Sequence, residues 1–197
     1  MNDRVHISAI LLAAGSSQRM GADPEGVPIN KMLLRFSGKT AIEYCLERFS
    51  ALCDEVIFVV SESTFDLASA LSERCAVPVK VVFGGERRQD SVINGVRAAS
   101  GDIVAIHDCA RMLVSSEAIS RAIKSAEQYG SGVAAIPVRD TIRFASTGET
   151  VPRDDLYQMQ TPQCFDRLRL IDAYAVASGD HTDDASVWQQ AYGPVKL

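Results

Sequence analysis

The sequence predicts an α/β fold, with a mainly parallel sheet, helices on both faces and an extended β-hairpin arm. Short apolar runs alternate with amphipathic stretches along most of the chain, which is typical of βαβ units. After Pro137 this alternation gives way to strand-like pieces separated by turn residues, and helical spacing then returns. The chain has 197 residues, 47% of them hydrophobic, which is enough for one sizeable core. We therefore expect a single domain over residues 1–197, with the arm at about 138–160.

The first strand is expected at 7–12, an apolar run that ends in small residues. A helix is expected at 40–52, because Ile42, Cys45, Leu46 and Phe49 share one helical face. The same alternation predicts strands at 55–60, 77–83, 103–106 and 133–136, and helices at 65–75, 90–99 and 116–129, the last capped by serine. Such an open, doubly wound arrangement is Rossmann-like.

The arm is predicted from strand-like residues at 141–144 and around Val151, with the turn-rich Ser146-Thr147-Gly148-Glu149 between them. Helical spacing returns at 166–177 and at 183–192. The second of these helices begins with aspartates, which suit the positive end of the helix dipole.

Composition excludes several classes of function. A net charge of -5 and a pI near 5.2 leave no broad basic surface, so we expect no nucleic-acid partner. The first residues carry charge without a signal pattern, and no apolar run approaches the length of a membrane span. Five scattered cysteines indicate reduced thiols, so we expect a cytoplasmic protein. The three histidines are too separated for a zinc site, and no residues are expected to bind metal directly.

Small residues follow the first strand, where an open α/β sheet binds ligands. The segment Ala13-Ala14-Gly15-Ser16-Ser17-Gln18-Arg19-Met20-Gly21 lets main-chain N–H groups approach phosphate oxygens, and Arg19 and Lys31 add positive charge. The pattern is neither a Walker loop nor G-x-G-x-x-G, so a dinucleotide site is disfavoured. A plain structural turn beside two surface cations is the alternative.

Two further strand ends carry candidate binding residues. Gly84-Gly85-Glu86-Arg87-Arg88-Gln89-Asp90-Ser91-Val92 leads into a helix, and its main-chain groups and the Ser91 hydroxyl suit the edge of a base. His107-Asp108-Cys109-Ala110-Arg111 offers a carboxylate for ribose hydroxyls or magnesium. An ordinary turn and a helix cap are the respective alternatives, and we expect His107 to be structural.

The three strand-end motifs described above, together with motifs further along the chain, resemble those of the 2-C-methyl-D-erythritol 4-phosphate cytidylyltransferases. The resemblance extends over essentially the whole chain, and the motifs occur in the same order. Later pieces of the resemblance are Pro137-Val138-Arg139-Asp140-Thr141-Ile142, Gln160-Thr161-Pro162-Gln163 and Thr182-Asp183-Asp184-Ala185. The resemblance implies a nucleotidyltransferase domain in which an oxygen of the acceptor phosphate attacks the α-phosphorus of CTP and expels pyrophosphate. The acceptor is already ionised, so no general base is needed.

By the same resemblance, Arg19 and Lys31 are transition-state cations and Mg²⁺ is bound mainly through the CTP phosphates. The matched nucleotide-binding positions are Ala13, Ala14, Gly15, Gly85, Glu86, Ser91, Asp108 and Cys109. The arm resembles the family's dimerisation arm, which implies a homodimer. Arg153 would then position the acceptor, with Arg111, Thr141 and Thr161 as further acceptor-binding residues.

Two departures from the family pattern stand out. Met112 follows Arg111 where the family has proline, and the chain ends at Leu197 where the family continues into a strand and a helix, which we expect to be missing. Three alternatives to a methylerythritol phosphate cytidylyltransferase of one activity remain. The chain could be the front part of a longer two-activity protein, a ribitol 5-phosphate cytidylyltransferase, or a catalytically weakened nucleotide-binding protein.

Overall fold

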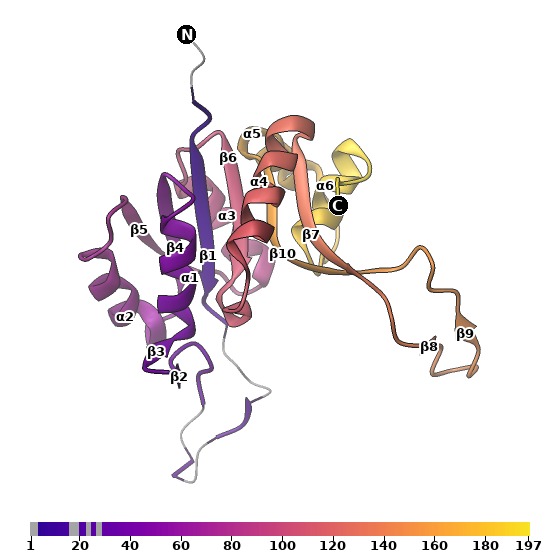
Figure 1. Cartoon of the computed structure of the whole chain (residues 1–197), viewed down its shortest axis with the longest axis horizontal. Helices are drawn as coiled ribbons and strands as arrows, with labels where there is room; N and C mark the ends of the chain where they lie inside the picture. The colour runs from indigo at the N-terminus through magenta and orange to yellow at the C-terminus, as the bar shows by residue number, and fades with distance from the viewer. Residues whose placement is uncertain (1–3, 16–19, 23–24, 27–28) are drawn as a thin grey trace.

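The computed structural model describes residues 4–15, 20–22, 25–26 and 29–197, and a six-stranded sheet forms its centre (Figure 1). The strand order is β5-β4-β1-β6-β10-β7. The strands are β1 (Ile7–Ala13), β4 (Glu55–Val60), β5 (Val79–Phe83), β6 (Ile103–Asp108), β7 (Ser131–Pro137) and β10 (Tyr157–Asp166). The first four in spatial order are mutually parallel, whereas β10 is antiparallel to both of its neighbours. The predicted mainly parallel sheet is confirmed.

Helices cover both faces of this sheet, as predicted, because the strands are apolar on both sides. Along β1, Ala9 and Leu11 pack towards one set of helices, and Ile10 and Leu12 towards the other. The first set is α1 (Ala41–Ser50), α2 (Glu62–Ser72) and α4 (Ser116–Tyr129), and the second is α3 (Arg88–Ala98), α5 (Arg167–Val176) and α6 (Asp184–Tyr192).

Capping residues explain where these helices begin. Thr40 caps α1: its hydroxyl accepts a hydrogen bond from the Glu43 N–H at 3.3 Å, and the Glu43 carboxylate accepts one from the Thr40 N–H at 2.7 Å. Ser115 caps α4, and Asp183 caps α6 by accepting from the Ser186 N–H at 3.0 Å. Most predicted boundaries lie within three residues of the observed ones.

Strand β10 is the main element that sequence patterns missed. Residues 157–166 contain glutamines, a threonine and a proline, which do not give the apolar alternation of a strand. Its register on β7 shifts between Met159 and Gln163, around Pro162. The small hairpin of β2 (Arg35–Phe36) and β3 (Lys39–Thr40) was also not predicted.

The predicted arm is a hairpin of β8 (Ile142–Arg143) and β9 (Thr150–Val151) that extends well away from the sheet (Figure 1). The Phe144 N–H donates to the Glu149 carbonyl at 2.9 Å and closes the turn. The last residues of the chain lie along the outer edge of β7, where the Val133 N–H donates to the Lys196 carbonyl at 2.8 Å. Among the described residues, no helix combines the length and the apolar character of a membrane span.

Candidate functional site

The carboxyl ends of β1, β5 and β6 bring the predicted binding motifs to one edge of the sheet. Strands β1 and β6 are neighbours, with Leu12 opposite Asp108. Gly84, directly after β5, approaches the end of β1 so closely that an added Cβ would lie 2.6 Å from the Ala14 Cβ and 2.7 Å from the Ser91 hydroxyl. A side chain at Gly84 would therefore displace the turn from β1. The two glycine-containing turns adjoin one another at this edge.

Ser91 holds the second of these turns from inside. Its hydroxyl accepts a hydrogen bond from the Gly85 N–H at 3.0 Å and donates one to the Arg87 carbonyl at 3.2 Å. The residue is buried, whereas Glu86 on the turn is exposed. Within this chain, the Ser91 hydroxyl therefore fixes the shape of the turn.

Asp108 ends β6, and each of its carboxylate oxygens faces a different arginine. Oδ1 lies 3.4 Å from Arg88 Nε, and Oδ2 lies 3.6 Å from Arg111 Nε. The Asp108 side chain remains 30% exposed. The carboxylate is therefore charge-compensated and still accessible to a ligand.

His107, the preceding residue, is fully buried, as expected for a structural histidine. Its Nδ1 lies 2.8 Å from the Thr161 hydroxyl and its Nε2 lies 3.3 Å from the Arg111 carbonyl. The buried Cys109 accepts a hydrogen bond from the Cys45 thiol on its carbonyl at 3.5 Å. Both ring nitrogens of His107 thus contact polar groups near the end of β6.

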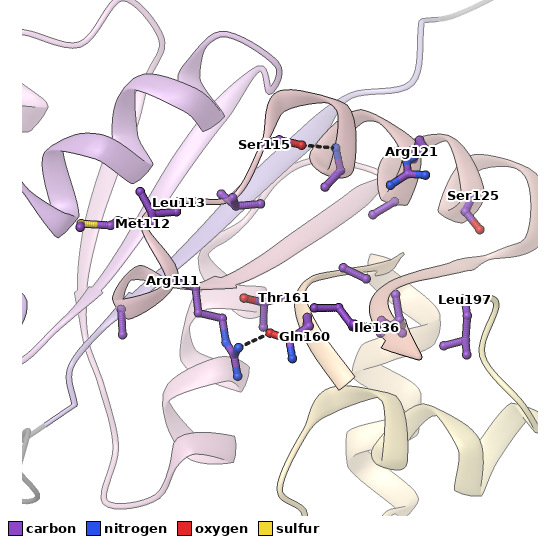
Figure 2. A pocket seen from close by; sticks show the side chains of 17 residues that line it. Arg111, Met112, Leu113, Ser115, Arg121, Ser125, Ile136, Gln160, Thr161 and Leu197 are labelled. Atoms are coloured by element: carbon purple, nitrogen blue, oxygen red, sulfur yellow. Dashed lines mark hydrogen bonds between the residues drawn. The ribbon is translucent and has the colours of Figure 1, made fainter. Parts of the chain in front are cut away.

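A cavity of about 660 Å³ lies between α4 and β7 (Figure 2). Arg111, Gln160 and Thr161 lie together on one side of it, and Arg111 Nη1 donates a hydrogen bond to Gln160 Oε1. Two of the predicted acceptor-binding residues, Arg111 and Thr161, therefore line one cavity beside Asp108.

Lys31 lies in a turn whose next residue enters the core. Met32 is buried, and its N–H donates to the Asn30 side chain at 3.0 Å. The Asn30 amide also donates to the Ser63 hydroxyl at 3.0 Å, which ties this segment to the start of α2. Arg19, the other predicted catalytic cation, lies outside the described residues.

Thr141 and Arg153 lie on or beside the arm and are exposed. Arg153 Nη1 donates a hydrogen bond to the Arg139 carbonyl within the arm. Because the arm extends away from the sheet (Figure 1), a single chain does not bring these two residues to the strand ends.

A buried polar network behind Asp108 was not predicted, although its members stand in or near the quoted motifs. Arg88 Nη2 pairs with the fully buried Asp184 at 2.9 Å, and the Tyr174 hydroxyl donates to the same carboxylate at 2.5 Å. Burial opposes the charge of Arg88, but Asp184 and Asp108 raise the pKa of its guanidinium. Burial and the Asp184 charge raise the pKa of Tyr174. No local pattern marks these residues, because their partners lie on other elements of the fold.

The sequence profile of the family described as 2-C-methyl-D-erythritol 4-phosphate cytidylyltransferase matches residues 7–197. The enzyme of that name from Clostridium botulinum (strain Langeland) is 35% identical, over 94% of this chain and 84% of the relative. That from Caldanaerobacter subterraneus is 36% identical, over 98% and 89%. The crystal structure of the Thermus thermophilus enzyme superposes with a TM-score of 0.78 at 29% identity, over 98% of this chain and 87% of that one.

Proposed function

We propose a reaction on the ground that this chain belongs to the 2-C-methyl-D-erythritol 4-phosphate cytidylyltransferase family. In this reaction the chain joins CTP to 2-C-methyl-D-erythritol 4-phosphate. The products are 4-diphosphocytidyl-2-C-methyl-D-erythritol, an intermediate of isoprenoid biosynthesis, and pyrophosphate. One observation supports this most: the accessible Asp108 carboxylate ends β6 next to the turns at Ala14 and Gly84. Nucleotides bind at such strand ends in open α/β sheets.

The nucleotide would occupy the edge formed by the two turns. Ala13, Ala14, Gly15, Gly85, Glu86, Ser91 and Cys109 would bind it, largely through main-chain groups or by shaping the turns. Asp108 would accept hydrogen bonds from the ribose hydroxyls. The arginines that face both oxygens of Asp108 favour this role over direct metal binding, because they repel a cation.

The reaction needs positioning and positive charge rather than a base. An oxygen of the acceptor phosphate would attack the α-phosphorus of CTP, and the bond to the β-phosphate oxygen would break with its electron pair leaving on pyrophosphate. The engagement of both His107 nitrogens by neighbouring groups agrees with a reaction that needs no general base. Arg19 and Lys31 would stabilise the charge that develops on the phosphoryl oxygens. Mg²⁺, held mainly by the CTP phosphates, would neutralise part of the triphosphate charge.

The acceptor would lie beside Arg111 and Thr161, in the cavity that both residues line. Both residues also contact Asp108. Thr141 and Arg153 would come from the arm of a second copy, so the enzyme would be a homodimer. The arm supports this, because an isolated two-stranded hairpin is marginally stable in water and this one exposes Phe144 to 55%.

The cytoplasm is the compartment that we propose. The five cysteines are all free thiols, and such thiols persist in reducing compartments. The proposed substrates are charged phosphates, which do not cross membranes unaided.

Pyrophosphate release tests the proposed reaction. With CTP and 2-C-methyl-D-erythritol 4-phosphate we expect turnover that Lys31→Ala lowers by about 10²–10³-fold, as for loss of one preorganised charge. Lys39→Ala is the matched control, because Lys39 forms a surface ion pair with Glu47. Faster turnover with ribitol 5-phosphate would reassign the acceptor. Absence of turnover with either acceptor would favour a nucleotide-binding protein without this activity.

A further inference from the structure

We propose that Arg88 is a positioning residue that orients Asp108 for the ribose of the nucleotide, and that the buried Asp184 sets the orientation of Arg88. This inference rests on the proposed function in one respect, the binding of ribose hydroxyls by Asp108. It assigns a role to two residues that the reaction itself leaves unused: Gln163 of the segment Gln160-Thr161-Pro162-Gln163, and Asp184 of the segment Thr182-Asp183-Asp184-Ala185.

One guanidinium joins two carboxylates from separate elements. Arg88 stands at the start of α3, and its Nε lies 3.4 Å from Asp108 Oδ1 at the end of β6. Its Nη2 lies 2.9 Å from Asp184 Oδ2 at the start of α6. The planar fork of arginine reaches both at once, whereas a lysine would offer a single ammonium group.

Asp184 is the most constrained of the three residues in the series Asp184, Arg88 and Asp108. Its side chain is fully buried, and both oxygens have donors: Tyr174 donates to Oδ1 at 2.5 Å and Arg88 to Oδ2. A buried carboxylate without such partners would be strongly destabilising, so its geometry is tightly constrained. The bond from Arg88 to Asp184 is also 0.5 Å shorter than its contact with Asp108. We infer that Asp184 holds Arg88 and that Arg88 in turn holds Asp108.

Gln163 of β10 anchors the start of α6. Its Oε1 accepts hydrogen bonds from the N–H groups of Asp184 and Ala185, both at 3.0 Å. Its side-chain amide donates to the Asp183 carboxylate at 3.2 Å. Gln163 is 1% exposed, so these bonds are shielded from water.

The same strand also holds the main chain of Asp108. The Thr161 hydroxyl accepts a hydrogen bond from the Asp108 N–H at 3.3 Å. Strand β10 therefore reaches Asp108 by two routes: Thr161 fixes its backbone, and the series Gln163, Asp184, Arg88 fixes its carboxylate.

A contact with the ribose is present both in the bound nucleotide and in the transition state. Losing it therefore weakens nucleotide binding while the rate of the bound complex stays nearly constant. For Arg88→Gln we expect the Kd of CTP to rise about tenfold and kcat to fall less than about twofold. The KM of the acceptor should stay within about twofold.

A double-mutant cycle, read by calorimetric titration of CTP, tests whether Arg88 acts through Asp108. The four chains are the wild type, Arg88→Gln, Asp108→Asn and the double variant. We expect each single change to raise the Kd about tenfold, and the double variant to bind within about twofold of Asp108→Asn. Multiplicative losses would show that Arg88 acts independently of Asp108 and would overturn the proposal.

Arg87→Gln is the matched control, because Arg87 stands in the same segment but forms exposed ion pairs with Asp90 and Asp180. Its Kd should stay within about twofold of the wild type. Should Arg88→Gln fail to fold, Asp184→Asn should raise the Kd in the same way while both Arg88 and Asp108 remain, and an unchanged Kd would overturn the proposal. A wild type that binds CTP without releasing pyrophosphate would contradict the proposed reaction alone, whereas one that binds no CTP would overturn both.

Discussion

Asp184 is fully buried and forms an ion pair with Arg88 at 2.9 Å, so the fold both encloses this carboxylate and supplies its counter-charge. Tyr174 completes that environment with a hydrogen bond of 2.5 Å. The stability of the fold and the geometry of the proposed nucleotide site thus depend on one cluster, in which α3, α5 and α6 meet.

Removing the Tyr174 hydroxyl should destabilise the chain without changing its charge. Tyr174→Phe leaves the buried Asp184 short of one donor, and we expect the free energy of unfolding to fall by about 2 kcal/mol in urea denaturation. Tyr44→Phe is the control: its hydroxyl donates to the Phe36 carbonyl at the surface, and we expect a loss below about 1 kcal/mol. Equal losses in the two variants would contradict the burial argument.

Glu55 should make the stability dependent on pH at acidic values. Burial opposes its ionisation, but hydrogen bonds from Ser8 and Ser100 and the charge of Lys80 lower the pKa of Glu55 from 4.5 to about 2. The folded chain therefore releases this proton more readily than the unfolded chain. The stability it contributes is present above about pH 4.5 and is lost as the pH falls towards 2.

We therefore expect Glu55→Gln to lower the free energy of unfolding by about 2 kcal/mol at pH 7, and by progressively less below pH 4.5. The full value of the pKa shift is discounted, because Lys80 is 48% exposed and solvent screens its charge. Urea denaturation of both chains at several pH values measures the difference. Glu47→Gln, which breaks a surface ion pair with Lys39, should change stability by less than about 0.5 kcal/mol. A difference between Glu55→Gln and the wild type that persists at pH 2 would contradict the assignment.

Two glycines of the proposed site should respond differently to alanine. At Gly84 a Cβ would meet Ala14 and Ser91 below 3 Å, so Gly84→Ala should lower the free energy of unfolding by about 1–3 kcal/mol and weaken CTP binding. Among the residues that the structure describes, none comes within 4 Å of a Cβ added at Gly15, so Gly15→Ala should leave stability nearly unchanged. If Gly15 admits a phosphate, its variant should weaken CTP binding alone. Thermal melts and calorimetric titration separate these effects, and unchanged CTP binding by Gly15→Ala would argue against phosphate contact there.

If the arm completes the active site of a second copy, a mixture of two inactive variants should recover activity. Arg153→Ala and Lys31→Ala would damage different halves of a shared site, so a mixed dimer would contain one intact site. After subunit exchange we expect about a quarter of the wild-type pyrophosphate release, because half of randomly formed dimers are mixed. Each variant alone should stay near its own low rate. No recovery, with mixed dimers demonstrated by light scattering or tagged pull-down, would show that the arm does not complete a neighbouring site.

The α/β fold and most of its elements followed from local patterns. The apolar run of β1, the helical face of Ile42, Cys45 and Phe49, and the serine cap of α4 are signals carried within a few residues. The turns of the proposed site were also predictable, because small residues and glycines occur where strands end. These features depend on backbone conformation and on which faces are apolar, and both are encoded locally.

Strand β10 shows where that reasoning ends. Its Thr161 and Gln163 have the local sequence of a polar loop, yet both are buried. Their polar groups are stabilised by His107, by Asp108 and by the N-terminus of α6. None of these partners is near β10 in the sequence except the start of α6.

The amino-acid sequence by itself determined the layered α/β architecture and the small-residue turns at the strand ends, since these follow from residue type and spacing. Only the tertiary structure decided that β10 enters the sheet between β6 and β7, and that Arg88 lies between Asp108 and Asp184. The physical reason is that a buried polar or charged group is tolerated only with partners, and the fold supplies those partners from distant parts of the chain.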